Sequence, residues 1–242
     1  MTPLVLVHGF MGGSAQWDGQ RTAFGNTREV ITVALPGFGK HAHLPAINSI
    51  DGFADWVISD LHAKGIARYH LLGHSMGGMI AQEIARKDSA RIGRLVLYAT
   101  GALGVLPGRF ETIAESKARA VSDGACATAR RIAATWFLHG EAAPGYADCA
   151  GVAEQASLNA ILAGLDAMEG WSGTAALKDI RAETLIIWGD RDRTYAWAQI
   201  EQLWADLPLA SLAVVPNCAH AVHLEKNSIF NALLRDFIEA AD

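Results

Sequence analysis

The chain has 242 residues, of which 51% are hydrophobic and 19% are charged, and its mean hydropathy is +0.17. These values suit one α/β domain with a large buried core and room for an insertion. The formal net charge of -5 and the pI of 6.0 argue against a nucleic-acid partner, because the basic residues are scattered and form no stripe that could bind phosphates.

Short apolar runs alternate with helical segments along the chain, which predicts βαβ units and a parallel sheet. The first run has no basic residues before it and is too short for a signal peptide or a membrane span. We therefore expect it to be the first core strand of a cytoplasmic protein that has no membrane partner. The predicted strands are residues 4–7, 30–34, 70–72, 94–98, 184–188 and 211–215. Their nearly continuous apolar character is typical of strands covered by helices on both faces, so the predicted fold is a doubly wound six-stranded parallel sheet.

Amphipathic helices are predicted between these strands. The clearest begins after Ser49, a residue type suited to an N-cap, and Gly65 ends it. Its apolar residues recur at helical spacing, and they are Ile50, Phe53, Ala54, Val57, Ile58 and Leu61. A second helix covers residues 82–87. In the last helix we expect four residues to face inward, namely Ile229, Leu233, Phe237 and Ala240.

Ser75 is the most informative residue of the chain. It lies between an apolar strand and a helix, in the sequence Gly73-His74-Ser75-Met76-Gly77-Gly78. A serine with glycine two residues before and two after, in this context, predicts a sharp and strained turn that exposes a nucleophilic hydroxyl. The glycine-rich loop 8–13 after the first strand is either a simple turn or half of an oxyanion hole. We favour the second interpretation, with backbone N–H groups of Phe10 and Met76 as donors.

The alternation of strands and helices breaks between residues 101 and 181. This stretch has no convincing strand, and it has helical patches near residues 109–122, 125–138 and 152–169. An insertion of this size predicts a second small layer rather than a loop. We expect a helical cap over residues 101–181, with the core formed by residues 1–100 and 182–242. Four cap residues are candidates for the wall of a substrate pocket: Trp136, Phe137, Met168 and Trp171.

A nucleophilic serine needs a base and a carboxylate that orients the base. His220 follows the sixth strand and is expected at the same edge of the sheet as Ser75, because parallel strands present their carboxyl ends together. His223 is the alternative base. Asp190 and Asp192 both follow the fifth strand, and we favour Asp192 because it reaches further toward His220. His8 and the remaining candidates His41, His43, His62 and His139 are interpreted as structural or surface residues.

Neither a metal nor a cofactor is predicted. The three cysteines are odd in number and far apart, and no Cys-x-x-Cys spacing is present. This pattern argues against a zinc site and favours a reducing compartment. Cys218 lies two residues before His220, and we interpret it as a buried structural residue.

These motifs together resemble the α/β-hydrolase superfamily over essentially the full chain. The matching pieces are His8-Gly9-Phe10, Leu35-Pro36-Gly37-Phe38-Gly39, the Ser75 motif, Gly189-Asp190-Arg191-Asp192, and His220 with Glu225 five residues later. The resemblance implies the chain order Ser75, Asp192, His220 for the triad and a lid role for the insertion. One departure is that relatives usually begin with an antiparallel hairpin, which is missing before the first strand here. For this reason we expect six strands rather than eight.

Within the superfamily, the serine of the motif differs from the aspartate of epoxide hydrolases and haloalkane dehalogenases. Residues 75–82 and the pair Trp136-Phe137 look like those of 3-oxoadipate enol-lactonases and related carboxylesterases. The resemblance therefore implies hydrolysis of a small carboxylic ester or lactone. We expect the protein to be a monomer or a homodimer. The alternatives are carbon–carbon bond hydrolysis or elimination by the same triad, and a ligand receptor built on a hydrolase scaffold.

Overall fold

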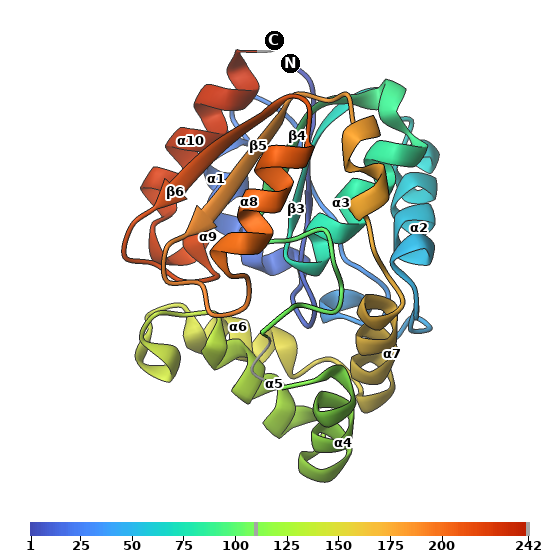
Figure 1. Ribbon diagram of the computed structural model, residues 1–242, viewed down its shortest axis with the longest axis vertical. Helices are drawn as coiled ribbons and strands as arrows, with labels where there is room; N and C mark the ends of the chain where they lie inside the picture. Colours follow the sequence, from blue (N-terminus) through green and yellow to red (C-terminus); the bar gives the residue numbers. More distant parts are fainter. Residues whose placement is uncertain (109–110, 241–242) are drawn as a thin grey trace.

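Six parallel strands form one sheet in the order β2-β1-β3-β4-β5-β6 in the computed structural model, which describes residues 1–108 and 111–240 (Figure 1). The strands are β1 (Leu4–Val7), β2 (Val30–Thr32), β3 (Tyr69–His74), β4 (Ile92–Tyr98), β5 (Thr184–Gly189) and β6 (Ala210–Val215). All five pairings are parallel. The predicted fold class, a doubly wound six-stranded parallel sheet, is confirmed.

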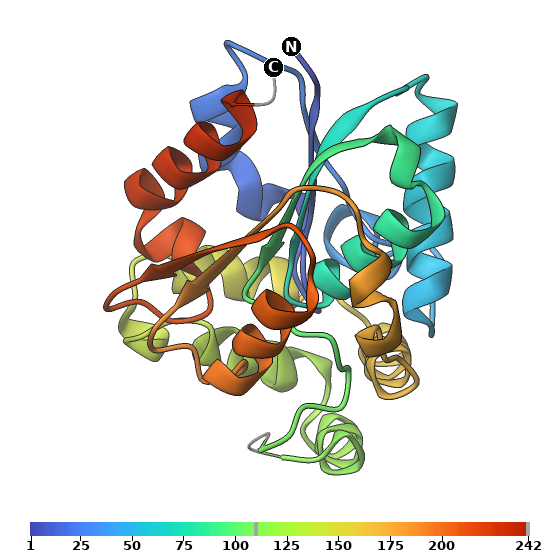
Figure 2. The same ribbon diagram turned by 45° about the horizontal axis from the view of Figure 1, so that its top comes forward.

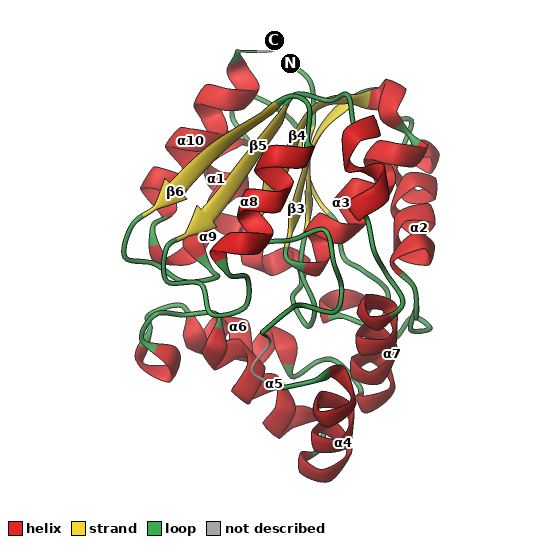
Figure 3. Ribbon diagram, viewed as in Figure 1, coloured by secondary structure: helices red, strands yellow, loops and turns green. Residues whose placement is uncertain are grey.

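The helices cover both faces of the sheet and one of its ends (Figure 3). They are α1 (Asp18–Phe24), α2 (Ile50–Ala63), α3 (Met76–Lys87), α4 (Ile113–Asp123), α5 (Ala125–Thr135), α6 (Tyr146–Ala153), α7 (Leu158–Glu169), α8 (Trp197–Asp206), α9 (Val222–Glu225) and α10 (Asn227–Glu239). Short 3₁₀ turns are η1 (Ser14–Trp17), η2 (Gly39–His41), η3 (Ser89–Arg91), η4 (Gly140–Ala142) and η5 (Thr174–Asp179). Over the described residues, no helix combines the length and the apolar character that crossing a membrane requires.

Alternate residues of the central strands build two separate cores, because successive side chains of a strand point to opposite faces. Leu4 and Leu6 of β1 pack in the core beneath α1 and α10, whereas Val5 and Val7 pack beneath α2 and α3. Figure 2 shows α1 and α10 on one side of the sheet and α2 and α3 on the other. The edge strand β6 is less covered than predicted, since Val214 is 46% exposed.

The predicted ends of α2 agree with the structure. The Ser49 side chain accepts a hydrogen bond from the Gly52 N–H at 3.1 Å, which caps the first turn. Gly65 follows the helix with φ +72, a left-handed conformation that glycine adopts without strain.

The prediction of which residues of α10 face inward is wrong, because the buried set is shifted by one position along the helix. The fully buried residues are Phe230, Leu234 and Ile238. Leu233 and Phe237 pack at the edge of this core, but Ile229 is 44% exposed and Ala240 is exposed. Both stripes are apolar and adjacent on the helix surface, so packing against the sheet decided which of them faces inward.

The segment that contains α4–α7 and their connections (residues 113–169), which we call the cap layer, lies between β4 and β5 in the chain and beyond the carboxyl ends of the strands, opposite the two chain termini (Figure 1). The two stems that join this segment to the sheet run antiparallel and pair at Leu103 and Ser172. The division into a core and a cap at residues 101–181 stays a prediction.

The helical patch predicted over residues 152–169 contains α7 and only the last two residues of α6, which begins earlier, at Tyr146, than predicted. Helix α7 begins where the Ser157 side chain accepts a hydrogen bond from the Ala160 N–H. In the patch predicted over 109–122, Thr112 and Glu115 form a capping box that starts α4 at Ile113. The predicted start of this patch, Arg109 and Phe110, lies outside the described residues.

The sheet topology creates the crevice in which a ligand site is expected. The connection after β1 leads to β2 on one side, and the next strand, β3, returns on the other side of β1. The loops that follow β1 and β3 therefore diverge, and open α/β sheets bind ligands at such a switch point.

The close approach of α3 to β1 gives a testable prediction about stability. A Cβ atom on Gly77 would lie 2.4 Å from the Val7 carbonyl oxygen and 2.5 Å from that of His8. Since both neighbours are backbone atoms, Gly77→Ala is expected to lower the free energy of unfolding by about 1–3 kcal/mol or more. Gly151→Ala is the control, because nothing lies within 4 Å of its Cβ position on α6, and it is expected to stabilise by up to about 1 kcal/mol. Urea titration measures both, and equal midpoints for the two variants would contradict the prediction.

Candidate active site

Ser75 occupies a strained turn between β3 and α3. Its backbone angles are φ 56 and ψ -121, which a residue with a side chain rarely adopts. The turn is sharp enough that a Cβ on Gly73 would lie 2.1 Å from the Gly77 carbonyl oxygen. The Ser75 N–H donates to the Tyr98 carbonyl at 3.0 Å, and Thr100 Oγ1 donates to the Ser75 carbonyl at 2.7 Å. Tertiary hydrogen bonds thus hold the conformation that the flanking glycines permit.

The loop after β1 lies directly against this turn. A Cβ on Gly9 would lie 2.9 Å from Ser75 Cβ and 3.1 Å from the His74 carbonyl oxygen. Phe10 follows Gly9, and Met76 is the first residue of α3, so its N–H has no acceptor within the helix. The two N–H groups predicted as an oxyanion hole therefore come from segments that meet at Ser75, while their function stays a prediction.

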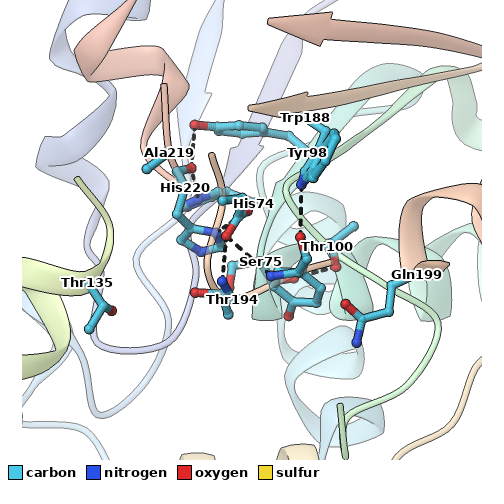
Figure 4. Close-up of polar contacts among 12 residues, drawn as sticks. His74, Ser75, Tyr98, Thr100, Thr135, Trp188, Thr194, Gln199, Ala219 and His220 are labelled. Atoms are coloured by element: carbon cyan, nitrogen blue, oxygen red, sulfur yellow. Dashed lines mark hydrogen bonds and ion pairs between the residues drawn. The ribbon is translucent and has the colours of Figure 1, made fainter. Parts of the chain in front are cut away.

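His220 and Asp192 form a buried pair. His220 Nδ1 lies 2.9 Å from Asp192 Oδ2, and the two side chains are 2% and 0% exposed. The other carboxylate oxygen, Oδ1, accepts hydrogen bonds from the Thr194 and Tyr195 N–H groups at 2.7 and 3.2 Å. A carboxylate with these acceptor contacts requires that His220 Nδ1 carry the proton, which leaves Nε2 available as a base. Figure 4 shows Ser75 and Thr194 next to His220.

Asp190 has a different set of contacts. Its Oδ1 accepts a hydrogen bond from the Asn217 N–H at 2.7 Å, and its Oδ2 lies 3.7 Å from Arg191 Nε. Asn217 has φ 54, so Asp190 stabilises a strained turn at the end of β6. Of the two aspartates weighed from the sequence, the structure pairs Asp192 with His220.

Two buried aromatic residues, Tyr98 and His74, contact the backbone carbonyl of His220. The Tyr98 hydroxyl donates to the His220 carbonyl at 2.9 Å, and His74 Nε2 lies 3.2 Å from the same oxygen. Tyr98 also contacts His223 Nδ1 at 2.9 Å. These bonds fix the loop that carries the imidazole (Figure 4).

His223, the alternative base, is buried in a less suitable position. Burial lowers the pKa of His223 to about 3, and its ring packs against Trp17 with centroids 4.6 Å apart. Burial also lowers the pKa of His74 well below its ordinary value, with smaller contributions from His220 and His223. His223 is not among the described residues that line the cavity beside Ser75, whereas His220 is.

A small cavity opens above Ser75 between the sheet and the cap layer. The centre of a water molecule can move through about 60 Å³ of it. The lining is mostly apolar, and around Ser75 and His220 it includes Phe10, Met79, Leu106, Ile132, Trp136 and Met168. The polar part of the wall includes Gln16, Thr135 and Thr194.

Two of the four predicted wall residues line this cavity, Trp136 and Met168, and two do not. Phe137 is 1% exposed and packs with Ala143, Cys149 and Ala221 in a separate core. Trp171 packs in the main core, where its indole N–H donates to Glu83 Oε1 at 2.9 Å. The position of Trp171 in the sequence is compatible with the cavity wall or with the core. The path of the chain after α7 places it in the core.

Tyr195 is a site residue that the sequence analysis did not identify. Its ring stacks on the His220 imidazole with centroids 5.7 Å apart and planes within 11°. Its backbone N–H also contacts Asp192, so one residue supports both members of the pair. The available signal was its position three residues after Asp192, in the loop that leaves the carboxyl end of β5.

The residues interpreted as structural have contacts consistent with that role. His8 Nε2 accepts from the Leu35 N–H at 3.0 Å, and burial lowers the pKa of His8 to about 4. Cys218 is buried, and its thiol donates a hydrogen bond to the Val215 carbonyl oxygen. Burial raises the pKa of the Cys218 thiol to about 12. Neither group is poised for nucleophilic or acid–base chemistry near neutral pH.

Comparison with known proteins identifies the family. Residues 4–233 match the model of the alpha/beta hydrolase family, and the chain belongs to that family. It is 28% identical to the pimeloyl-(acyl-carrier protein) methyl ester esterase of Aromatoleum aromaticum, with 97% of each chain covered. It is 29% identical to the 2-hydroxy-6-oxononadienedioate/2-hydroxy-6-oxononatrienedioate hydrolase of Paraburkholderia phymatum, over 97% of this chain and 86% of the relative.

One further relative matches less than half of the chain, and one solved structure matches nearly all of it. A 103-residue stretch is 39% identical to the dihydrolipoyllysine-residue acetyltransferase component of the acetoin cleaving system of Pseudomonas putida, covering 43% of this chain and 28% of that protein. The crystal structure of the enol-lactonase from Burkholderia xenovorans LB400 superposes with a TM-score of 0.89 at 21% identity, over 98% and 91% of the two chains. This second likeness establishes the shared fold.

The buried histidines give a prediction about stability and pH. His223 and His8 have folded-state pKa values of about 3 and about 4, below the 6.5 of an unfolded chain. The unfolded state therefore binds more protons below pH 6.5, and stability is full above that pH and is lost as the pH falls toward 4. Each histidine is expected to contribute a slope of about 1.4 kcal/mol per pH unit in this window.

Urea unfolding between pH 7 and pH 4 measures this slope. His223→Gln removes one of these titrating groups, so the slope is expected to decrease by about 1.4 kcal/mol per pH unit relative to the unaltered protein. An unchanged slope in the variant would show that His223 titrates alike in the folded and unfolded states.

Proposed function

We propose that this chain is a serine hydrolase that cleaves a small carboxylic ester or lactone through an acyl-enzyme intermediate. The observation that carries the proposal is that the strained Ser75 and His220 line the same cavity, and that His220 is paired behind it with the buried carboxylate of Asp192. The nucleophile, the base and the group that orients the base are then all supplied by one site.

In this mechanism, Ser75 Oγ attacks the carbonyl carbon while His220 Nε2 accepts its proton. The positive imidazolium is stabilised by Asp192, whose second oxygen is held by two backbone N–H groups. The negative oxygen of the tetrahedral intermediate accepts hydrogen bonds from the N–H groups of Phe10 and Met76. Protonation of the leaving oxygen by His220 gives the acyl-enzyme, and a water molecule deprotonated by His220 then releases the acid.

The cavity supports a small acyl group. It is enclosed by apolar side chains, among them Trp136 and Met168 from the cap layer, and little space remains beside Ser75. Apolar pockets of this kind bind the hydrocarbon part of a ligand, and a few polar groups orient it.

Carbon–carbon bond hydrolysis is the second candidate reaction. It is favoured by the 29% identity to a hydrolase named for 2-hydroxy-6-oxononadienedioate, which extends over 97% of this chain. The same serine and histidine would serve, so substrate profiling with esters, lactones and 1,3-diketones decides between the reactions. A ligand receptor without turnover is the alternative from another class, and hydrolysis of any of these compounds would exclude it.

Ester turnover with a Ser75→Ala control tests the proposal. We expect kcat/KM to be highest for acetyl or butyryl p-nitrophenyl esters and to decline through octanoyl and palmitoyl esters. Ser75→Ala is expected to reduce it by about 10³-fold or more while folding is retained. A fluorophosphonate probe should label Ser75, as read by peptide mass analysis. Labelling of a different serine, or a maximum at the palmitoyl ester, would contradict the nucleophile or the substrate class, respectively.

The two aspartates give a matched pair of variants. Asp192→Asn keeps the shape of the side chain but can place an NH₂ donor where the carboxylate oxygen accepted the His220 Nδ1 proton. His220 then takes the wrong tautomer, and kcat is expected to fall about 10³- to 10⁴-fold. Asp190→Asn disturbs only the turn at Asn217 and is expected to lose less than about tenfold. If Asp190→Asn proved the more severe change, the two roles would be reversed.

A further inference from the structure

Glu225 belongs to the motifs that resemble the superfamily, and the proposed mechanism gives it no role. It lies at the end of α9, five residues after His220, and it is partly buried. Its carboxylate joins two segments that are far apart in the sequence. Oε2 accepts a hydrogen bond from the Ala219 N–H at 2.6 Å, and Oε1 accepts one from the Leu138 N–H at 2.7 Å.

The first of these bonds holds the loop that carries the base. Ala219 immediately precedes His220 and is buried, and its N–H would otherwise lack an acceptor in the turn after β6. The bond joins an ionised acceptor to a backbone donor and is therefore among the stronger hydrogen bonds of the site.

The second bond holds the cap layer at the wall of the cavity. Leu138 lies two residues after Trp136, which lines the cavity. Two further bonds fasten the same short segment to the site loops. The Ala221 N–H donates to the Trp136 carbonyl at 2.9 Å, and Arg193 Nη2 donates to the Leu138 carbonyl at 2.8 Å. Ala221 and Arg193 are the direct neighbours of His220 and Asp192, so the wall is attached to both loops.

Only a carboxylate can make both Glu225 contacts. Two backbone N–H donors need two acceptor oxygens, and an ionised glutamate provides them. A glutamine of the same size has one oxygen and one NH₂ group, which would face an N–H donor at one of the two positions. The change Glu225→Gln therefore removes one contact with little change of volume.

We propose that Glu225 is a positioning residue that fixes the His220 loop and the Trp136 wall with a single carboxylate. Glu225 then determines both the alignment of His220 and the size of the acyl group that the cavity accepts. This inference rests on the proposed ester or lactone hydrolysis at Ser75.

The test compares Glu225→Gln with Glu154→Gln. Glu154 pairs with Arg130 between α6 and α5, so its variant loosens the cap layer without touching the site loops. In Glu225→Gln we expect kcat/KM for the butyryl ester to fall about tenfold and the ratio of octanoyl to butyryl kcat/KM to rise at least about threefold. Glu154→Gln is expected to change neither quantity. The same shift in both variants, or an equal loss on all chain lengths in Glu225→Gln, overturns the proposal.

Backbone amide exchange followed by NMR gives a readout that does not depend on turnover. In the unaltered protein, the N–H groups of Leu138 and Ala219 are expected to be protected, and exchange at the unprotected rate for either overturns the proposal even if no variant folds. Glu225→Gln is expected to raise at least one of the two rates about tenfold, and Glu154→Gln neither. Absence of both ester and lactone turnover in the unaltered protein would refute the proposed function, whereas unchanged exchange in Glu225→Gln would refute the role of Glu225.

Discussion

The contact between the start of α3 and the end of β1 is the constraint on which the rest of the site depends. Gly77 has no side chain, so the helix can begin against the backbone of Val7 and His8. With the helix at this place, the chain must reverse within one residue after β3, and Ser75 takes left-handed backbone angles. The same approach brings the loop at Gly9 against Ser75. One packing contact therefore positions a hydroxyl and the neighbouring N–H groups together.

A second constraint is that the site contains a buried charge. The Asp192 side chain is fully buried, which would be unfavourable for a lone carboxylate. Two backbone N–H groups and the His220 imidazole provide the hydrogen bonds that water would otherwise make. The neighbouring His74 and His223 have pKa values lowered mainly by burial and stay neutral near pH 7, so no fixed positive charge competes with His220 for the carboxylate.

The cap layer meets the sheet through backbone groups as much as through apolar packing. The segment from Trp136 to Leu138 receives hydrogen bonds from the two loops that carry Asp192 and His220, and it donates one to Glu225. The wall of the cavity is thus attached to the loops that carry His220 and Asp192. The shape of the cavity therefore depends on the same loops that position the residues of the proposed mechanism.

The sequence by itself determined the sheet, most strand positions and the candidate residues Ser75, Asp192 and His220. These features depend on local signals: apolar runs covered on both faces, glycines two residues on either side of a serine, and loops at the carboxyl ends of parallel strands. The tertiary structure alone decided which surface of α10 is buried and that Trp136 rather than Phe137 faces the cavity. Adjacent apolar residues have the same local signal, and only the position of the helix against its neighbours distinguishes them. Glu225 belongs to both groups, because its spacing from His220 is visible in the sequence, whereas its contact with Leu138 joins residues 87 positions apart.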